Sequence, residues 1–191
     1  ERPALEREVR TPDQANAVLR AGVGLKMRDD HPDFSAMVLA NHLLGGASSA
    51  RLPARIREKE GLSYSTYSWF SASPLDEVAS FNASAIFAPQ NKVRVESAMR
   101  EELARAIANG FTAEEVESAK RGLLEARRLA RTNDASLTGR FATYLFLNRT
   151  FAWDVEFERR IAALTPAELQ TALKRHLDPA KLAVSKAGDF K

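Results

Sequence analysis

Two residues about a third of the way along the sequence, Arg57 and Tyr64, have side chains and a spacing that could serve a reaction. Arg57 is expected in the last turn of a short helix, and Tyr64 early on the strand that follows Gly61. A guanidinium offers fixed donors to a carbonyl or carboxylate, and a phenol adds a hydroxyl donor on a stiff ring. If they converge across the turn, they could hold a peptide backbone or stabilise an oxyanion. The alternative is structural, with Arg57 placed at the negative end of the helix dipole.

The three histidines are the other candidates, as ligands for a metal. They are widely separated in sequence, and none has a partner at helical i+4 spacing: His31, His42 and His176. His31 and His42, on one helix, would lie about 16 Å apart, too far to share a zinc ion. Neither H-E-x-x-H nor H-x-x-E-H occurs. We therefore expect no metal site, with His31 near a helix start, His42 on a helix surface and His176 at a helix C-terminus.

No motif for a nucleophile or for phosphate binding stands out. The absence of Cys removes thiolate chemistry and disulfides but leaves the cellular compartment open. No serine lies in a G-x-S-x-G turn, and helix caps or strand positions explain Ser48, Ser49, Ser63, Ser65 and Ser68. The glycines lack the G-K-[ST] ending of a phosphate loop, namely Gly22, Gly24, Gly45 and Gly46.

Composition argues for a globular domain that does not bind nucleic acid and has no membrane span. The chain is 45% hydrophobic and 28% charged, within the ordinary globular range. Its 28 basic residues are interspersed with 25 acidic ones, whereas phosphate binding needs clustered, unopposed Lys and Arg. No apolar run approaches the ~20 residues of a membrane-spanning helix.

The hydrophobic periodicity predicts an α+β fold in which a mixed, largely antiparallel sheet is covered on one face by helices. Residues 1–13 are expected to be a tether from an upstream segment, and 14–191 a single domain. Alternation predicts strands at 16–27, 63–72, 78–87 and 182–187. Helices are expected at 30–44, from Ser48 or Ser49 to Gly61, at 92–108, from the Thr112 capping box, from Asn133 or Asp134, at 153–164 and from the Thr165 capping box.

The sequence around the two candidate residues resembles the signature of a known family. The pattern is L-G-G, then R-L, then I-R-E-x-x-G-L-x-Y-S, and it occupies positions 44–65. It is similar to the C-terminal, non-zinc domain of the pitrilysin, insulysin and mitochondrial processing peptidase family. The order of the expected elements extends the resemblance to about residues 14–187. One departure is Ser49-Ala50-Arg51-Leu52, where the family usually has Ser-Ser-Arg-Leu.

The resemblance implies a substrate-binding half of a zinc metalloendopeptidase, without peptidase activity of its own. A zinc-bearing homologous domain or subunit, which could be the other half of a dimer, would supply the metal and a glutamate base. Arg57 and Tyr64 would donate hydrogen bonds to a peptide substrate near its scissile carbonyl. No metal-ligand role carries over to this chain. A structural or chaperone-like member that has lost catalysis is a second hypothesis, and a self-contained hydrolase, which would need its own metal, is a third.

Overall fold

Alternating small or apolar and polar residues build a sheet that is buried on one face only. The computed structural model describes residues 5–190. Its five strands are β1 (Glu6–Arg10), β2 (Ala17–Leu25), β3 (Ser63–Ala72), β4 (Ala79–Phe87) and β5 (Ala183–Gly188), in the spatial order β1-β5-β2-β4-β3. β1 pairs with β5 in parallel, and the other pairings are antiparallel.

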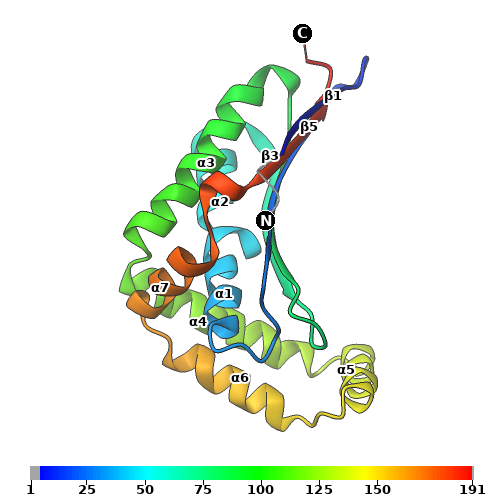
Figure 1. The fold of residues 1–191 in the computed structure, drawn as a ribbon, viewed down its shortest axis with the longest axis vertical. Helices are drawn as coiled ribbons and strands as arrows, with labels where there is room; N and C mark the ends of the chain where they lie inside the picture. The colour runs from blue at the N-terminus through cyan, green and yellow to red at the C-terminus, as the bar shows by residue number, and fades with distance from the viewer. Residues whose placement is uncertain (1–4, 191) are drawn as a thin grey trace.

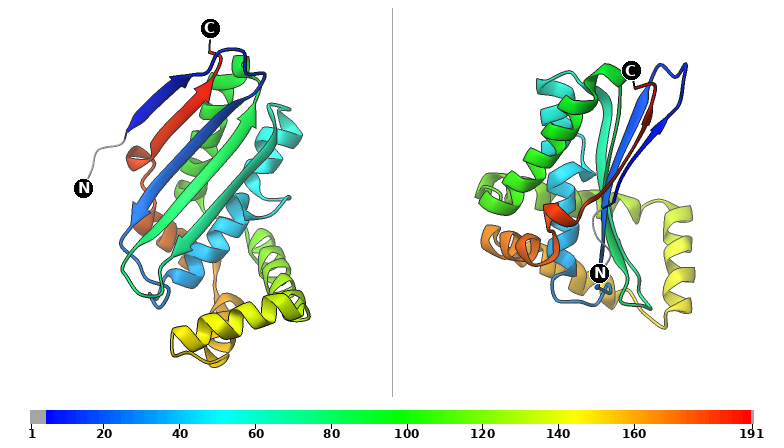
Figure 2. Two further views of the ribbon diagram at one scale, coloured as in Figure 1. Left: turned by 90° about the vertical axis from the view of Figure 1, so that its right-hand side faces the viewer. Right: turned by 45° about the horizontal axis from the view of Figure 1, so that its top comes forward.

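The helices lie on one side of this sheet, which Figure 1 shows nearly edge-on, except the helix of residues 134–146, which projects past the lower end of the sheet. They are α1 (Phe34–Asn41), α2 (Arg51–Pro53), α3 (Lys92–Asn109), α4 (Ala113–Ala130), α5 (Asp134–Phe146), α6 (Ala152–Ala163) and α7 (Pro166–His176). α1 runs on into a π-helical turn (His42–Gly46), and α2 into another (Ala54–Lys59). We call α2 and its π-helical continuation the short helix. Figure 2 shows the strands with their other face uncovered, which we call the open face.

The core lies between the sheet and the helices. Its strand residues alternate along the chain, and on β2 and β4 they are Ala17, Leu19, Ala21, Phe81, Ala83, Ala85 and Phe87. Apolar residues of the helices meet them, among them Leu39, Leu52, Met99 and Leu169. The predicted α+β fold, with a mixed, largely antiparallel sheet covered on one face, is confirmed.

Local signals placed most helix starts correctly. Both predicted capping boxes form, with Thr112 accepting from the Glu115 N–H and Thr165 from the Glu168 N–H. The short helix differs, because its N-cap is Ala50 and no side chain caps it, so the expected cap by Ser48 or Ser49 is wrong. No helix in the described part of the chain combines the length and apolar character that a membrane span requires.

The N-terminal stretch also differs from its prediction. Glu6–Arg10 lie within the segment assigned to a tether, yet they form edge strand β1, while residues 1–4 lie outside the described part. Every residue of β1 is exposed, so its sequence lacks the apolar alternation that marks a half-buried strand. Its Glu6 and Glu8 pair with Arg100 and Lys92 of α3, which fixes the strand against the helical layer.

At Gly45 the helical layer approaches the sheet closely. A Cβ at Gly45 would lie 2.6 Å from the backbone nitrogen of Ser68 and 2.7 Å from its Oγ, so no side chain fits without moving β3. The same serine is held by Asn41, whose Oδ1 accepts from the Ser68 hydroxyl at 2.8 Å.

We expect Gly45→Ala to lower the free energy of unfolding by about 1 to 3 kcal/mol, because the added methyl group overpacks this contact. Urea unfolding measures the change. The matched control is Gly24→Ala, where a Cβ would meet no atom within 4 Å, and where we expect a change below about 0.5 kcal/mol. Equal effects of the two substitutions would contradict the close approach.

Candidate functional site

A glycine turn connects the segment that carries Arg57 to the strand that carries Tyr64. Gly61 has φ +60, a left-handed conformation that suits glycine. Its N–H donates to the carbonyl of Arg57 at 3.2 Å, and the N–H of Leu62 donates to the carbonyl of Ile56 at 2.9 Å. These bonds close the end of the short helix and direct the chain into β3. Both candidate residues are therefore carried by one ordered segment, as the sequence predicts.

Tyr64 sits on a β-bulge at the start of β3. The register passes from Ser63 opposite Phe87 to Ser65 opposite Ile86, so Tyr64 has no partner residue on β4. The buried hydroxyl of Ser63 fixes this irregularity: it lies 2.6 Å from the carbonyl oxygen of Ile86 and accepts from the Ser65 N–H at 3.2 Å. Bulges re-aim side chains beside functional sites, and residue Tyr64 is 69% exposed.

Arg57 is also accessible, on the solvent side of the short helix. Its side chain is 41% exposed, and its Nε donates to Oε1 of the adjacent Glu58 at 2.7 Å. An exposed ion pair between adjacent residues contributes little to stability, so the guanidinium is free to change partner. Neither candidate side chain is packed into the interior. Their roles toward a substrate remain predictions.

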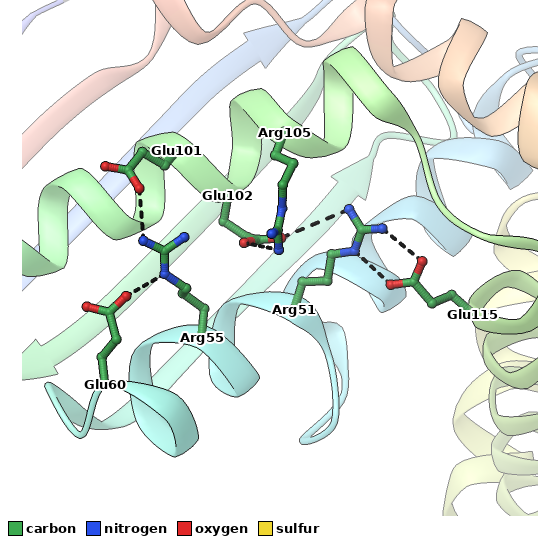
Figure 3. A network of polar contacts seen from close by, with 7 residues as sticks. All are labelled: Arg51, Arg55, Glu60, Glu101, Glu102, Arg105 and Glu115. Atoms are coloured by element: carbon green, nitrogen blue, oxygen red, sulfur yellow. Dashed lines mark hydrogen bonds and ion pairs between the residues drawn. The ribbon is translucent and has the colours of Figure 1, made fainter.

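The buried side of the short helix anchors it to α3 and α4 through apolar and polar contacts. Leu52 and Ile56 are fully buried in the core. Around them lies a network of arginines and glutamates, which Figure 3 shows close up. Its members are Arg51, Arg55, Glu60, Glu101, Glu102, Arg105 and Glu115. Arg55 reaches Glu101 of α3 at 2.8 Å and also bonds Glu60, so it ties the end of the short helix to the helical layer.

Arg51 is the central member of this network. It donates from Nε and Nη2 to the two carboxylate oxygens of Glu115 at 2.8 Å each, a bidentate pair between the short helix and α4. Its guanidinium also lies over the ring of Phe111 and 4.0 Å from the carboxylate of Glu102. The hydrogen bonds from Arg51 lower the pKa of Glu115 to about 2 even though burial opposes the shift.

The structure brings two of the histidines together, which their spacing in sequence did not indicate. The rings of His31 and His176 meet edge-on with centroids 5.3 Å apart, and His176 Nε2 lies 2.7 Å from Oδ2 of Asp33. Arg175 donates to the same oxygen at 2.6 Å. Burial would raise the pKa of Asp33, but the bonds from His176 and Arg175 outweigh it and hold that pKa below its ordinary value. The cluster thus clamps the end of α7 to the start of α1.

This cluster is a poor fit to a zinc ion, although the candidate ligand atoms of His31, Asp33 and His176 lie within 4.8 Å of one another. Nδ1 of His31 accepts from the Asp33 N–H at 3.0 Å, so the neutral ring carries its proton on Nε2, the nitrogen left for a metal. The carboxylate of Asp33 already binds the cation of Arg175. His42 lies elsewhere, half-buried beside α4, where burial lowers its pKa.

Comparisons with known proteins match this chain to one family. The model of the peptidase M16 inactive domain matches residues 2–123. A relative from Helicobacter pylori (strain ATCC 700392 / 26695), described as "Non-peptidase homolog YmxG", is 25% identical over 168 residues, which are 87% of this chain and 38% of that protein.

Solved structures agree with this match. The peptidase M16 inactive domain from Pseudomonas fluorescens superposes with a TM-score of 0.87 at 25% identity, over 99% of this chain and 44% of that one. The inactive peptidase domain of a proposed zinc protease from Bordetella parapertussis has the same fold, with a TM-score of 0.74 at 16% identity, over 90% of this chain and 91% of that one. The chain thus spans less than half of the first two of these three relatives.

We expect Glu115→Gln to lower the free energy of unfolding by about 1 to 2 kcal/mol at neutral pH, because it removes the charge from the bidentate pair with Arg51. Folding lowers the Glu115 pKa from 4.5 to about 2. The contribution of this carboxylate to the free energy of unfolding is therefore complete above pH 4.5 and is lost as the pH falls toward 2. Urea unfolding of both proteins across this range measures it. Glu114→Gln, at the exposed neighbouring position, is the control. A difference between wild type and Glu115→Gln that does not shrink on acidification would contradict the assignment.

Proposed function

Because the chain belongs to the peptidase M16 inactive-domain family, we propose that it is the substrate-binding, non-metal half of a zinc metalloendopeptidase. The Bordetella relative, named as the inactive domain of a proposed zinc protease, supports a zinc-bearing partner. The lengths of the other relatives support it too, since this chain spans 44% of the Pseudomonas protein. The partner is then a homologous domain or subunit, either fused to this chain or separate from it.

In this proposal Tyr64 and Arg57 donate hydrogen bonds to a bound peptide near its scissile carbonyl. The partner would hold the zinc ion, which would activate a water molecule, and would contribute a glutamate as base. The task of this chain is to hold the peptide and to place fixed donors where negative charge develops on the carbonyl oxygen. The observation that carries the proposal is the bulge clamped by Ser63, which gives a stiff phenol an exposed position beside the open face.

The second hypothesis is a structural or chaperone-like role in which catalysis has been lost. It is favoured by the name of the Helicobacter relative, a non-peptidase homolog, at 25% identity. The presence of both Arg57 and Tyr64 in this chain favours the peptidase half. A neighbouring sequence with H-x-x-E-H would support the peptidase, because that motif supplies ligands and base for the zinc.

We expect Tyr64→Phe to lower turnover of a peptide by on the order of 10- to 1,000-fold in the assembled enzyme, since it removes one donor to the developing oxyanion. Cleavage is measured with the zinc-bearing partner present. Tyr67→Phe is the matched control, because it removes the hydroxyl of another exposed tyrosine on the same strand. Unchanged cleavage by Tyr64→Phe would defeat the assignment.

A self-contained hydrolase would need a metal of its own, so metal analysis of the purified chain separates it from the proposed half-enzyme. We expect well below one zinc per chain, because the cluster of His31, Asp33 and His176 is satisfied by its own hydrogen bonds. Stoichiometric zinc that survives dialysis and is lost in His176→Gln would overturn this expectation.

A further inference from the structure

Two arginines on the open face have no acidic partner among the described residues. The neighbours of Arg20 on β2, Leu19 and Ala21, are buried in the core, so Arg20 is directed to the open face. The neighbours of Arg7, Glu6 and Glu8, pair with α3 on the helical side, so Arg7 is directed the same way. Both arginines stand opposite Ser185, one on each side of β5. Their Cα atoms are therefore roughly 10 Å apart, two strand spacings.

The charges of the molecule are unevenly divided between the two faces. On the helical side arginines meet carboxylates, as Arg51, Arg127 and Arg149 do with Glu115, Glu158 and Asp29. The strand residues that alternate onto the open face include no Asp or Glu in the described part of the chain. Two guanidinium groups without counter-charge give this face a local positive potential.

A hollow on the open face lies between these arginines and an aromatic side chain. It is lined by Arg7, Arg20, Gly22, Gly24, Asn82 and Trp69, with Leu5 and further strand residues. At Gly24 a Cβ would meet no atom within 4 Å, so the missing side chain leaves open space above the sheet. Trp69, from edge strand β3, stands opposite Asn82 and closes the other side. At Gly22 the amide of Asn82 occupies this space, since a Cβ there would lie 2.5 Å from its Oδ1. The hollow thus has an open floor at Gly24, one cationic wall and one aromatic wall.

We infer that this hollow is a specificity subsite for acidic side chains of the peptide substrate, an inference that rests on the proposed function. Arginine presents paired donors that match the geometry of a carboxylate. Two arginines with no acidic residue beside them are therefore suited to bind an acidic side chain. The face of Trp69 would pack against the apolar stem of the same residue. From Tyr64 the hollow is roughly 15 Å away, which is four or five residues along an extended peptide.

The test is a binding measurement on this chain with two peptides of one sequence. Both peptides have an acetylated N-terminus and an amidated C-terminus. One carries two Glu and the other two Gln at the positions that would reach the hollow. We expect the Glu peptide to bind more tightly, with the preference declining as salt is raised. In the variant with Arg7→Gln and Arg20→Gln the preference should fall by about three- to tenfold. The control is Arg121→Gln, at an exposed arginine on α4, and this variant should keep the full preference for the Glu peptide.

The outcomes separate this inference from the proposed function. Equal binding of the two peptides, no binding of either, or an equal loss in Arg121→Gln would overturn the subsite. A Gln peptide with a free C-terminus that binds as tightly as the Glu peptide would assign the hollow to a terminal carboxylate and overturn the side-chain assignment. If the preference for Glu depends on Arg7 and Arg20 while Tyr64→Phe leaves cleavage unchanged, the subsite stands and the catalytic role of Tyr64 fails.

Discussion

The buried carboxylate of Glu102 is the constraint from which the placement of the candidate site follows. Its side chain is fully buried, and a carboxylate without compensation there would cost several kcal/mol. Arg105 donates to both of its oxygens at 2.7 and 2.6 Å, and Arg51 lies 4.0 Å away. Because Arg51 also binds Glu115, the short helix is held to α3 and α4 at once. The turn at Gly61, which leads into β3, begins at the end of this anchored helix.

Local patterns predicted most elements of this fold, because their signals lie within a few residues of chain. The capping boxes at Thr112 and Thr165 and the alternation along β2 and β4 are of this kind. β1 depends on pairing with β5 at the far end of the chain, and its exposed residues carry no apolar pattern, so it could not be predicted this way. Ala50 begins the short helix without a side-chain cap, and tertiary packing replaces the missing local signal.

The positions of Arg57 and Tyr64, at the end of the short helix and the start of β3, were predictable from sequence. The bulge was not, because it is a difference in register between β3 and β4 that appears only when the two strands are paired. The meeting of His31 with His176 depends in the same way on how α1 packs against α7.

The uncovered face of the sheet allows stability and recognition to evolve separately. Successive residues of a strand point to opposite faces, so Leu19 and Phe81 can hold the core while Arg20 and Asn82 change. Substitutions on the exposed side of the sheet therefore leave the buried face unchanged. The Pseudomonas domain keeps the backbone arrangement at a TM-score of 0.87 although three residues in four differ, at 25% identity. If the proposed subsite is correct, a few strand substitutions with a small effect on folding would change the peptide preference.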